Sequence, residues 1–469
     1  MATLIEQHPL YDTLPVGQDV IFTLSNHFVV TTETNVKFIA EVYIDKSPIV
    51  PSTGVGYVGQ FKTTPNGAGR GMFNFKPIIE SYVNADNLAN ISSNYKGTFI
   101  GNTNPTPVHL VDEFSRNKNI TKYFAVVFRI EYLDTTATPP VIVVGHSSTV
   151  SDEMKIFNGY LKHSDILNTA ASDFGYYIEK FFVSKVVIFG DKPGRWLTNA
   201  PDNRYALTTD YGVTSLFSFP YKGAQIDKIE LTYTENDGAT TTETVANIYT
   251  KGGQGTYMSN SDWNILHFGC YPANIRSWST VFEALITAGT LASYTVVGQT
   301  DAGLDVTYPF TVNILCPTLK GYEPIRLTWL NQWGTWDYYT FNMKSSKSIS
   351  TKGSTYQQLP GTWNESHYRP NSYKGGTRAF RVNATEKVIM NTDFVNEAES
   401  EWFEELINSP EVYILEGYQT DPTLSSLNNY VTPVRLTTSS YTRKTVANDK
   451  LMQYTFEVEK SKTLRTQAV

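Results

Sequence analysis

The chain has 469 residues, and its 38 Lys and Arg against 45 Asp and Glu give a net charge of −7. This acidic balance argues against a broad electrostatic nucleic-acid binder, because neutralising phosphates requires a basic face, and we expect no sequence-specific binding of nucleic acid. Charged residues make up only 18% of the chain and aromatic residues 13%, with 30 Tyr and 25 Phe. Since branched and aromatic side chains fit a pleated, half-buried surface, this composition predicts a mainly β protein and excludes a coiled coil.

The sequence shows no signal for a membrane or for secretion. No apolar run approaches the roughly 18–20 residues that span a bilayer, so we expect no membrane span. The first ten residues lack the basic segment and the apolar core of a signal peptide, so we expect no secretory route. Cys270 and Cys316 are too few to form a disulfide framework in a chain of this length. Reduced, buried thiols are the favoured interpretation, and the sequence leaves open whether the two pair.

At roughly 150 residues per domain the length predicts about three domains, and residues 1–183 are predicted to form an N-terminal β-rich domain. Alternating apolar and polar residues mark strands at residues 21–24, 36–44, 73–79, 123–133 and 141–144. We expect the first two to pair across a turn near 31–35, the third to lead from a strand into a helix, and the last two to form a hairpin. A short helix is expected over residues 164–182.

A glycine-rich stretch, residues 51–71, lies between the second and third of these strands. It is too long for a tight hairpin, so we predict an exposed loop. The segment from Gly54 to Gly59 formally matches the dinucleotide-binding fingerprint, but that fingerprint needs a strand, a tight turn and then a helix, and residues 60–65 cannot start one. We therefore predict no nucleotide site and take Gly54, Gly59 and Gly67 as candidate interaction residues.

Residues 184–320 are predicted to form a central domain that resembles a β-sandwich. Its predicted strands are residues 186–189, 215–219, 228–233 and 242–249. Residues 235–238 read Glu-Asn-Asp-Gly, and Gly and Asp supply the backbone angles of a turn, so the last two strands should form a hairpin. A helix is expected over residues 277–286.

Residues 321–469 are predicted to form a C-terminal α+β domain, and Trp becomes common there, with five of the chain's eight. Two alternating segments, residues 325–329 and 336–341, predict a Trp-rich hairpin. Asn396 and Glu399 form a capping box at the start of an amphipathic helix, residues 396–408. Its apolar face holds Ala398, Trp402, Phe403, Leu406 and Ile407, and its glutamates, Glu397, Glu401, Glu404 and Glu405, point mostly the other way. Further strands are expected at 412–415, 434–436 and 454–459. This order predicts a sheet with one helix packed on a face.

The titratable residues give no strong signal for catalysis or for a cofactor. The seven His residues do not have the close spacing of zinc motifs, and neither Cys has a nearby partner. No Gly-x-Ser-x-Gly elbow occurs. We therefore predict no catalytic, metal or cofactor-binding residue, and expect a protein that is not an enzyme.

The Trp-rich hairpin is the candidate site that the sequence favours most. Asp337 lies beside Trp333 and Trp336, and an aromatic platform next to a carboxylate can hold a sugar. A glycosidase would need a second carboxylate across the scissile bond, and the sequence does not show one. The simpler interpretation, which we favour, is a hairpin whose aromatic side chains pack across the two strands.

Residues 322–341, which read Tyr-Glu-Pro-Ile-Arg-Leu-Thr-Trp-Leu-Asn-Gln-Trp-Gly-Thr-Trp-Asp-Tyr-Tyr-Thr-Phe, resemble a segment of tail structural proteins from tailed bacteriophages that infect Bacteroidetes, including crAss-like phages. Residues 392–414, 432–436 and 453–459 fit the same pattern, and residues 73–83 are similar in style. The likeness covers about 140 C-terminal residues well and the first 320 loosely. It is a pattern of strands and aromatic residues, so it brings no functional residue with it.

The resemblance implies a non-enzymatic virion protein, made in the cytoplasm of the bacterial host, that forms a homo-oligomeric ring of the tail between the portal and the tail tip. Its partners would then be copies of itself and adjacent portal, ring or tail-tip proteins, and it would line or stiffen the channel for DNA ejection. Polar segments 51–71 and 344–376 are expected to be arms that order on neighbouring subunits. The alternative is a tail-borne protein that binds or depolymerises glycans through Trp333, Trp336 and Asp337.

Overall fold

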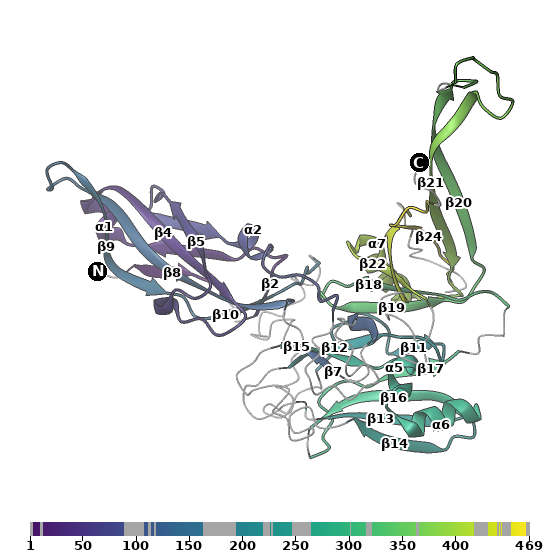
Figure 1. Cartoon of the computed structure of the whole chain (residues 1–469). Helices are drawn as coiled ribbons and strands as arrows, with labels where there is room; N and C mark the ends of the chain where they lie inside the picture. The colour runs from purple at the N-terminus through teal and green to yellow at the C-terminus, as the bar shows by residue number, and fades with distance from the viewer. Residues whose placement is uncertain are drawn as a thin grey trace. The chain divides into compact units, whose positions relative to one another are not determined.

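The structure is a computed structural model in which strands dominate (Figure 1). It describes residues 3–9, 13–88, 107–110, 114–116, 119–162, 194–218, 226, 228–245, 264–300, 302–315, 321–362, 365–416, 430–438, 440, 442 and 452–465. The predicted mainly β class, with antiparallel sheets and few helices, is confirmed.

The chain forms two compact units. Unit 1 comprises Met1–Ile314, Leu330–Asp337 and Thr420–Leu427, and unit 2 comprises Leu315–Trp329, Tyr338–Gln419 and Asn428–Val469. The predicted domain boundaries at 183/184 and 320/321 fall within or beside segments outside the described residues, so the division into three domains stays a prediction.

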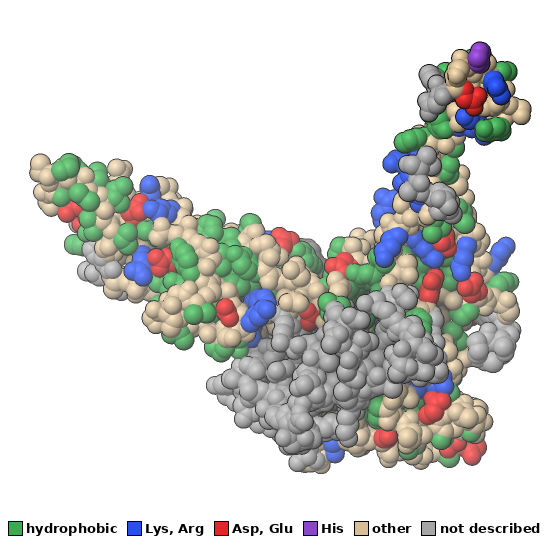
Figure 2. Space-filling model, viewed as in Figure 1, with side chains coloured by type: hydrophobic (Ala, Val, Ile, Leu, Met, Phe, Trp, Pro, Cys, Tyr) green, Lys and Arg blue, Asp and Glu red, His purple; other side chains and the backbone are tan. Residues whose placement is uncertain are grey.

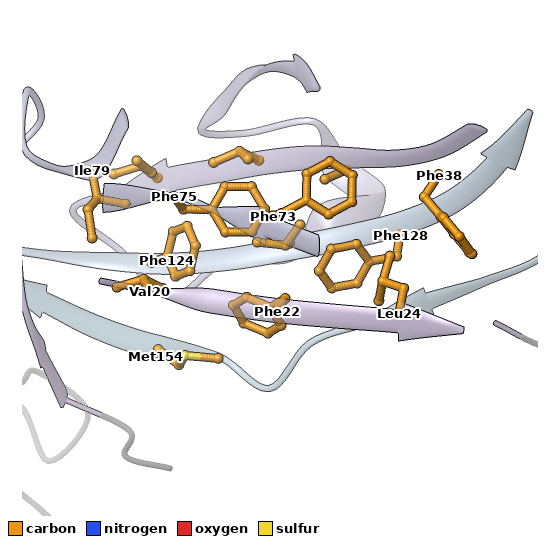
Figure 3. Packing of buried hydrophobic residues seen from close by; sticks show 14 of the residues in the cluster. Val20, Phe22, Leu24, Phe38, Phe73, Phe75, Ile79, Phe124, Phe128 and Met154 are labelled. Carbon is orange, nitrogen blue, oxygen red and sulfur yellow. The ribbon is translucent and has the colours of Figure 1, made fainter. Parts of the chain in front are cut away.

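The first part of unit 1 contains two sheets. A three-stranded sheet has the order β1 (Leu4–Gln7), β3 (Ile21–Ser25) and β6 (Arg70–Asn74). A six-stranded sheet has the order β2 (Thr13–Pro15), β10 (Met154–Phe157), β8 (Thr121–Asp134), β4 (Thr34–Asp45) and β5 (Tyr57–Thr63), with β9 (Val141–Val150) also paired to β8. Phe22 and Phe73 of the smaller sheet meet Phe128 of the larger one, with ring centroids 5.4 and 6.1 Å apart (Figure 3). Aromatic side chains from both sheets therefore build one core.

Some of the predictions for this part are confirmed and others are wrong. The hairpin of β8 and β9 is confirmed, as are strand β6 and the helix after it, α2 (Lys76–Ile79). The strands at 21–24 and 36–44 form, but they lie in different sheets. Helix α1 (His27–Thr32) connects them, and β4 already begins at Thr34, within the turn that was expected near 31–35. Asn26 caps that helix, because its side chain accepts a hydrogen bond from the amide of Val29 at 3.2 Å.

The prediction of an exposed loop over residues 51–71 is also wrong for residues 57–63, which form strand β5. A short 3-10 helix, η1 (Pro51–Thr53), leads to β5, which pairs with β4 from Tyr57 to Thr63. Val58 and Phe61 of β5 pack against the aromatic core. The glycines of this segment favour a loop locally. The strand forms because it pairs with β4 and packs on the core, and not because of its local propensity.

The rest of unit 1 contains a five-stranded and a three-stranded sheet. The larger has the order β11 (Asn203–Ala206), β17 (Phe310–Ile314), β16 (Leu291–Gln299), β13 (Lys228–Glu235) and β14 (Thr240–Val245). The smaller has the order β12 (Val213–Ser218), β15 (Asn264–Gly269) and β7 (Phe114–Arg116). Short helices are η2 (Val108–Leu110), α5 (Pro272–Arg276) and α6 (Thr280–Ala288).

The predicted hairpin of β13 and β14 is confirmed as far as Val245, and the predicted helix near 277–286 is confirmed as α6. Ser279 caps that helix through a bond from the amide of Phe282 to its hydroxyl, 2.9 Å long. The helix predicted over residues 164–182 and the strand predicted over residues 186–189 lie outside the described residues.

Unit 2 is built on a seven-stranded sheet. Its order is β19 (Trp336–Phe341), β18 (Ile325–Leu330), β22 (Val412–Leu415), β23 (Val431–Leu436), β24 (Thr455–Lys460), β21 (Gly376–Asn391) and β20 (Ser346–Gln358). The strand pairs of this sheet for which the register is described are all antiparallel. The predicted sheet with one amphipathic helix, α7 (Glu397–Asn408), is confirmed. The long strands β20 and β21 were not predicted.

Helix α7 packs on this sheet through aromatic side chains. Trp402 lies against Trp329 of β18, with centroids 4.8 Å apart, and Phe403 lies 5.4 Å from Phe456 of β24. The predicted capping box forms: the amide of Glu399 donates to the side chain of Asn396 at 2.8 Å, and the return bond is 2.9 Å. The predicted faces need two corrections, because Glu405 is buried and Ala398 is exposed.

Candidate interaction surface

The Trp-rich turn that the sequence favours as a binding site is buried. Trp333 is 0% exposed, Trp336 is 2% exposed and Asp337 is 3% exposed. Trp333 joins an apolar cluster with Phe157, Phe217 and other buried residues of unit 1. A side chain without exposed surface cannot stack on a sugar, so the turn offers no aromatic platform. The favoured interpretation of a β-hairpin holds, but its aromatic residues pack on segments far away in sequence.

Polar contacts hold this turn in place. The indole Nε1 of Trp336 donates to the carbonyl oxygen of Asp86 at 3.0 Å, and the hydroxyl of Thr198 donates to Asp337 Oδ1 at 2.6 Å. The Asn331 side chain accepts from the amide of Trp333 at 3.0 Å. These bonds satisfy the Trp336 indole, the Asp337 carboxylate and the Trp333 amide, and hydrogen bonding is the usual condition for burying such groups. Asp337 therefore serves the fold.

Gly334 explains why the turn needs a glycine. Its φ is +73°, and a Cβ placed there would come 2.1 Å from the carbonyl oxygen of Asn158. Both the backbone angle and the close approach exclude a side chain.

The three candidate glycines lie at separate places and form no site. Gly54 follows η1 with a φ of +73°, Gly59 lies within β5, and Gly67 lies in the connection between β5 and β6. The stretch that formally matches a dinucleotide fingerprint runs into strand β5 and not into a helix, so its glycines cannot present a helix N-terminus to a phosphate.

Buried titratable groups in unit 1 also serve the fold. The Ser215 hydroxyl and His267 Nδ1 lie 2.7 Å apart, but His267 is 0% exposed, and burial lowers its pKa to about 4. A fully buried pair cannot reach a substrate. In the described part of the chain no three His, Cys, Asp or Glu side chains are grouped closely enough to hold a metal ion. Cys270 is buried, and Cys316 lies outside the described residues.

Strands β20 and β21 form the most exposed feature of the described residues, here called the ribbon (Figure 1). Their register is antiparallel from the pair Ser346 and Ile389 to the pair Gln358 and Gly376. All residues from 346 to 357 and from 376 to 382 are exposed, so neither face of the outer ribbon is covered. The sequence predicted a polar, exposed arm over residues 344–376. Residues 346–357 are indeed exposed, but residues 346–358 form a strand and not a loop.

The two faces of the outer ribbon differ in chemistry. Since side chains alternate between faces and paired residues share one, Lys352, Arg381 and Arg378 lie on the same face. This basic face also carries Ser354 and Tyr356. The other face carries Ile349 and Val382, which are 64% and 47% exposed. Figure 2 shows Lys and Arg gathered along the ribbon.

Charges at the base of the ribbon are paired, whereas three cations on its outer strands are not. Lys347 lies 2.8 Å from Glu323, and Lys387 lies 2.7 Å from Glu457. In both cases the carboxylate raises the pKa of the lysine. Within the described residues, Lys352, Arg378 and Arg381 make no ion pair. The Arg378 guanidinium donates to the carbonyl oxygen of Tyr373 at 2.5 Å, so Lys352 and Arg381 are the two cations of this face that are available to a partner.

Exposed apolar side chains accompany these cations. Phe380 sits at an irregularity in the pairing and is 51% exposed, and its ring centroid lies 6.3 Å from that of Tyr356. Tyr368 and Tyr373 lie in the connection from β20 to β21, and they are 65% and 69% exposed. Exposed apolar groups that are rimmed by polar ones commonly mark interaction surfaces.

No known protein family matches the sequence, and no curated protein matches it either. Among the described residues, no helix is both long enough and apolar enough to cross a membrane.

Proposed function

We propose that the chain is a non-enzymatic structural protein of a bacteriophage tail, which assembles with copies of itself into a ring between the portal and the tail tip. The ribbon is the arm through which one copy holds the next. The observation that carries the proposal is the exposure of both ribbon faces over residues 346–357 and 376–382. An isolated two-stranded ribbon is marginal in water, so a partner that covers it would stabilise it.

The topology supports an arm of this kind. Strand β20 lies at the edge of the seven-stranded sheet, and within the described residues its 13 residues pair only with β21. Edge strands of this length are usually shortened or covered, because their free amide and carbonyl groups can pair with another chain. Arms that order on a neighbouring subunit also fit the resemblance to tail proteins, in which the protein would be part of the virion.

The alternative, a glycan-binding or depolymerising protein, loses the residues on which it rested. Trp333, Trp336 and Asp337 are all buried, and Asp337 is bonded to Thr198. No other observation favours a glycan, so the structural role is the better proposal.

The test is the mass of the purified chain in solution, measured by light scattering, with negative-stain images of the same sample. We expect closed rings of several copies. A chain that stays monomeric at every concentration from micromolar to millimolar, with or without the portal-side tail proteins, would contradict the proposal.

A shortened ribbon is the matched variant. Residues 352–383 are replaced by Asn-Gly, so that Thr351 and Ala384, which already face each other, flank a two-residue turn. This variant should fold and remain monomeric. If it forms rings as the full chain does, the ribbon is not the arm.

A further inference from the structure

We infer that strand β20 of the ribbon adds to the six-stranded sheet of a second copy of this chain, where it pairs antiparallel with the free edge of strand β9. The inference rests on the proposed function and deepens it, because it names the surface that the arm grips. Strand addition of this kind draws on main-chain hydrogen bonds between the two edges and on side-chain contacts across their faces.

Strands β9 and β20 are unusually long for edge strands. Among the edges of the described sheets, only these two have ten or more residues, with 10 and 13. Within the described residues, β9 pairs only with β8, and no backbone hydrogen bond joins residues 141–148 to any other segment. Alternate amide and carbonyl groups of each edge therefore point away from their sheet. Edge strands are usually kept short, so two long ones in a single chain point to each other as partners.

Neither edge carries the charges that commonly protect an exposed strand. Residues 141–150 and 353–358 contain no Lys, Arg, Asp or Glu. Charged side chains, Lys above all, are a common device that keeps an edge from pairing with another chain. Residues 141–144 read Val-Ile-Val-Val, and β-branched side chains favour a strand. Both edges are therefore chemically open to a further strand.

Exposed apolar side chains lie at both edges. Ile142 and Val144 point to the same face of β9, and each is more than half exposed. On the basic face of the ribbon, Tyr356 is also exposed, and its ring lies beside that of Phe380. An aromatic residue opposite a β-branched one is among the favourable cross-strand pairs. Contact between these side chains would remove apolar surface of both copies from water.

These side chains also define a register. Strand β9 pairs regularly with β8 over residues 141–145, and its register shifts beyond them. If residues 353–357 lie antiparallel along this regular part, Tyr356 stands opposite Ile142 and diagonal to Val144. Opposite residues share a face, and an aromatic ring reaches the diagonal neighbour as well. This register therefore brings the exposed aromatic group of the ribbon onto the exposed apolar pair of β9.

A second ribbon would be a poorer partner than β9. Residues 352–383 contain five Lys and Arg against one Glu, a net charge of +4, so two ribbons side by side would repel each other. Residues 121–150, which form β8, β9 and their turn, contain two charges of each sign. Pairing of β9 with β9 would leave the ribbon uncovered. Contact between β20 and β9 joins two different patches of one chain, and such head-to-tail interfaces close into rings when the rotation allows it.

The first test is a disulfide bond between two copies. Single-cysteine variants are mixed and oxidised in two pairs, S354C with V144C and T355C with V143C. Successive cross-strand pairs alternate between two geometries, and the closer one brings the Cα atoms to about 4.5 Å, which a disulfide can bridge. We expect at least one mixture to give a cross-linked dimer on a non-reducing gel. The wild type, which keeps the two native cysteines, is the control.

The same variants separate the other pairings. Cross-linking of V143C or V144C with itself would show that β9 pairs with β9, and cross-linking of S354C or T355C with itself would show that two ribbons pair; either result contradicts the inference. A chain with both T355C and V143C should give covalent chains or rings of several copies. If that chain forms only an internal disulfide in a monomer, the ribbon grips its own chain and the inference is overturned.

Lysines on the β9 edge test the contact without a disulfide. In the proposed register, the lysines of I142K/V144K would share a face with Lys352 and Arg381, the two available cations. All four positions are exposed, so the variants should keep the circular-dichroism spectrum of the wild type. By light scattering, this edge variant should associate roughly tenfold more weakly than the wild type, because like charges oppose strand pairing. Adding K352E/R381E should recover most of the loss. On its own, K352E/R381E should change association less than about threefold, because β9 is uncharged.

The matched control is V50K/L304K, which places two lysines at exposed apolar positions of unit 1 outside β9, and it should associate like the wild type. If the edge variant associates like the wild type, or if the control is as weak as the edge variant, the inference is wrong. If the wild type assembles and neither cysteine mixture cross-links, the inference fails and the proposed function stands. If the wild type does not assemble at all, both fail.

Discussion

Two hairpins stand at opposite edges of the seven-stranded sheet, and they differ in almost every physical respect. The hairpin of β18 and β19 has a turn in which Trp333 and Trp336 are buried. The hairpin of β20 and β21 is exposed on both faces over most of its length. The comparison teaches that aromatic residues in a turn do not by themselves indicate a binding surface. In this chain the aromatic turn stabilises the fold, and the Ser, Thr and Lys-rich hairpin is available to a partner.

The two hairpins should differ most in how much a substitution lowers the free energy of unfolding. Substituting Trp336 by Ala should lower the free energy of unfolding by about 3–5 kcal/mol, because it leaves a large cavity and removes the donor to the carbonyl of Asp86. Substituting Tyr373 by Ala, which is 69% exposed between the ribbon strands, should change it by less than about 0.5 kcal/mol. Urea unfolding followed by circular dichroism measures both. A Trp336 variant as stable as the Tyr373 variant would show that the first turn is not structural.

The core around the buried turn should also be sensitive to acid. His267 lies two residues after Ile265, a member of the cluster that contains Trp333. Its pKa is about 4 in the folded chain against 6.5 in the unfolded chain, so below pH 6.5 the unfolded state binds the extra proton. The stability of the core is full above pH 6.5 and falls by about 3 kcal/mol as the pH drops to 4.

Urea unfolding at pH 7.5, 5.5 and 4.5 measures this loss, and the variant His267→Gln should lack this part of the pH dependence. Acid should leave the outer ribbon unchanged, because residues 346–357 and 376–382 contain no His, Asp or Glu. Equal pH dependence of the wild type and the Gln variant would contradict the assignment to His267.

The sequence predicts elements well where local chemistry and burial agree. The capping box of Asn396 and Glu399 and the apolar face of α7 predicted the helix, and the Asp-Gly turn at 237–238 predicted the hairpin of β13 and β14. Alternation in residues 325–329 and 336–341 likewise predicted the strands of the first hairpin.

The elements that the sequence missed lack that agreement. Strand β20 has no buried face, so its sequence, Ser-Lys-Ser-Ile-Ser-Thr-Lys, shows no apolar alternation. Strand β5 contains Gly59 and follows two further glycines, which favour a loop locally. The burial of Trp333 and Trp336 depends on Phe157, Phe217 and Asp86, which lie more than a hundred residues away. No local pattern could reveal such contacts.

A smaller change in stability is expected from the cap of helix α7, which packs against β18 of the first hairpin. Helix α7 places Trp402 against Trp329 of β18, and its start depends on the Asn396 cap. Substituting Asn396 by Ala should lower the free energy of unfolding by about 1 kcal/mol, since one helix amide loses its partner. Asn396→Asp keeps an acceptor and should stay close to the wild type. Urea unfolding compares the three, and an Ala variant as stable as the Asp variant would argue against the cap.

The smallest change in the free energy of unfolding is expected for the largest alteration of the sequence, the shortened ribbon. The variant in which Asn-Gly replaces residues 352–383 loses 30 residues in net length, yet apart from Gly361 none of the described residues among them is buried. The free energy of unfolding should therefore change by less than about 1 kcal/mol, because little apolar surface returns to water when these residues are removed. Differential scanning calorimetry and urea unfolding measure it, with the Trp336 variant as the destabilised reference. A loss of several kcal/mol would mean that the ribbon stabilises its own chain, which would remove the main physical reason for regarding it as an arm for a neighbouring copy.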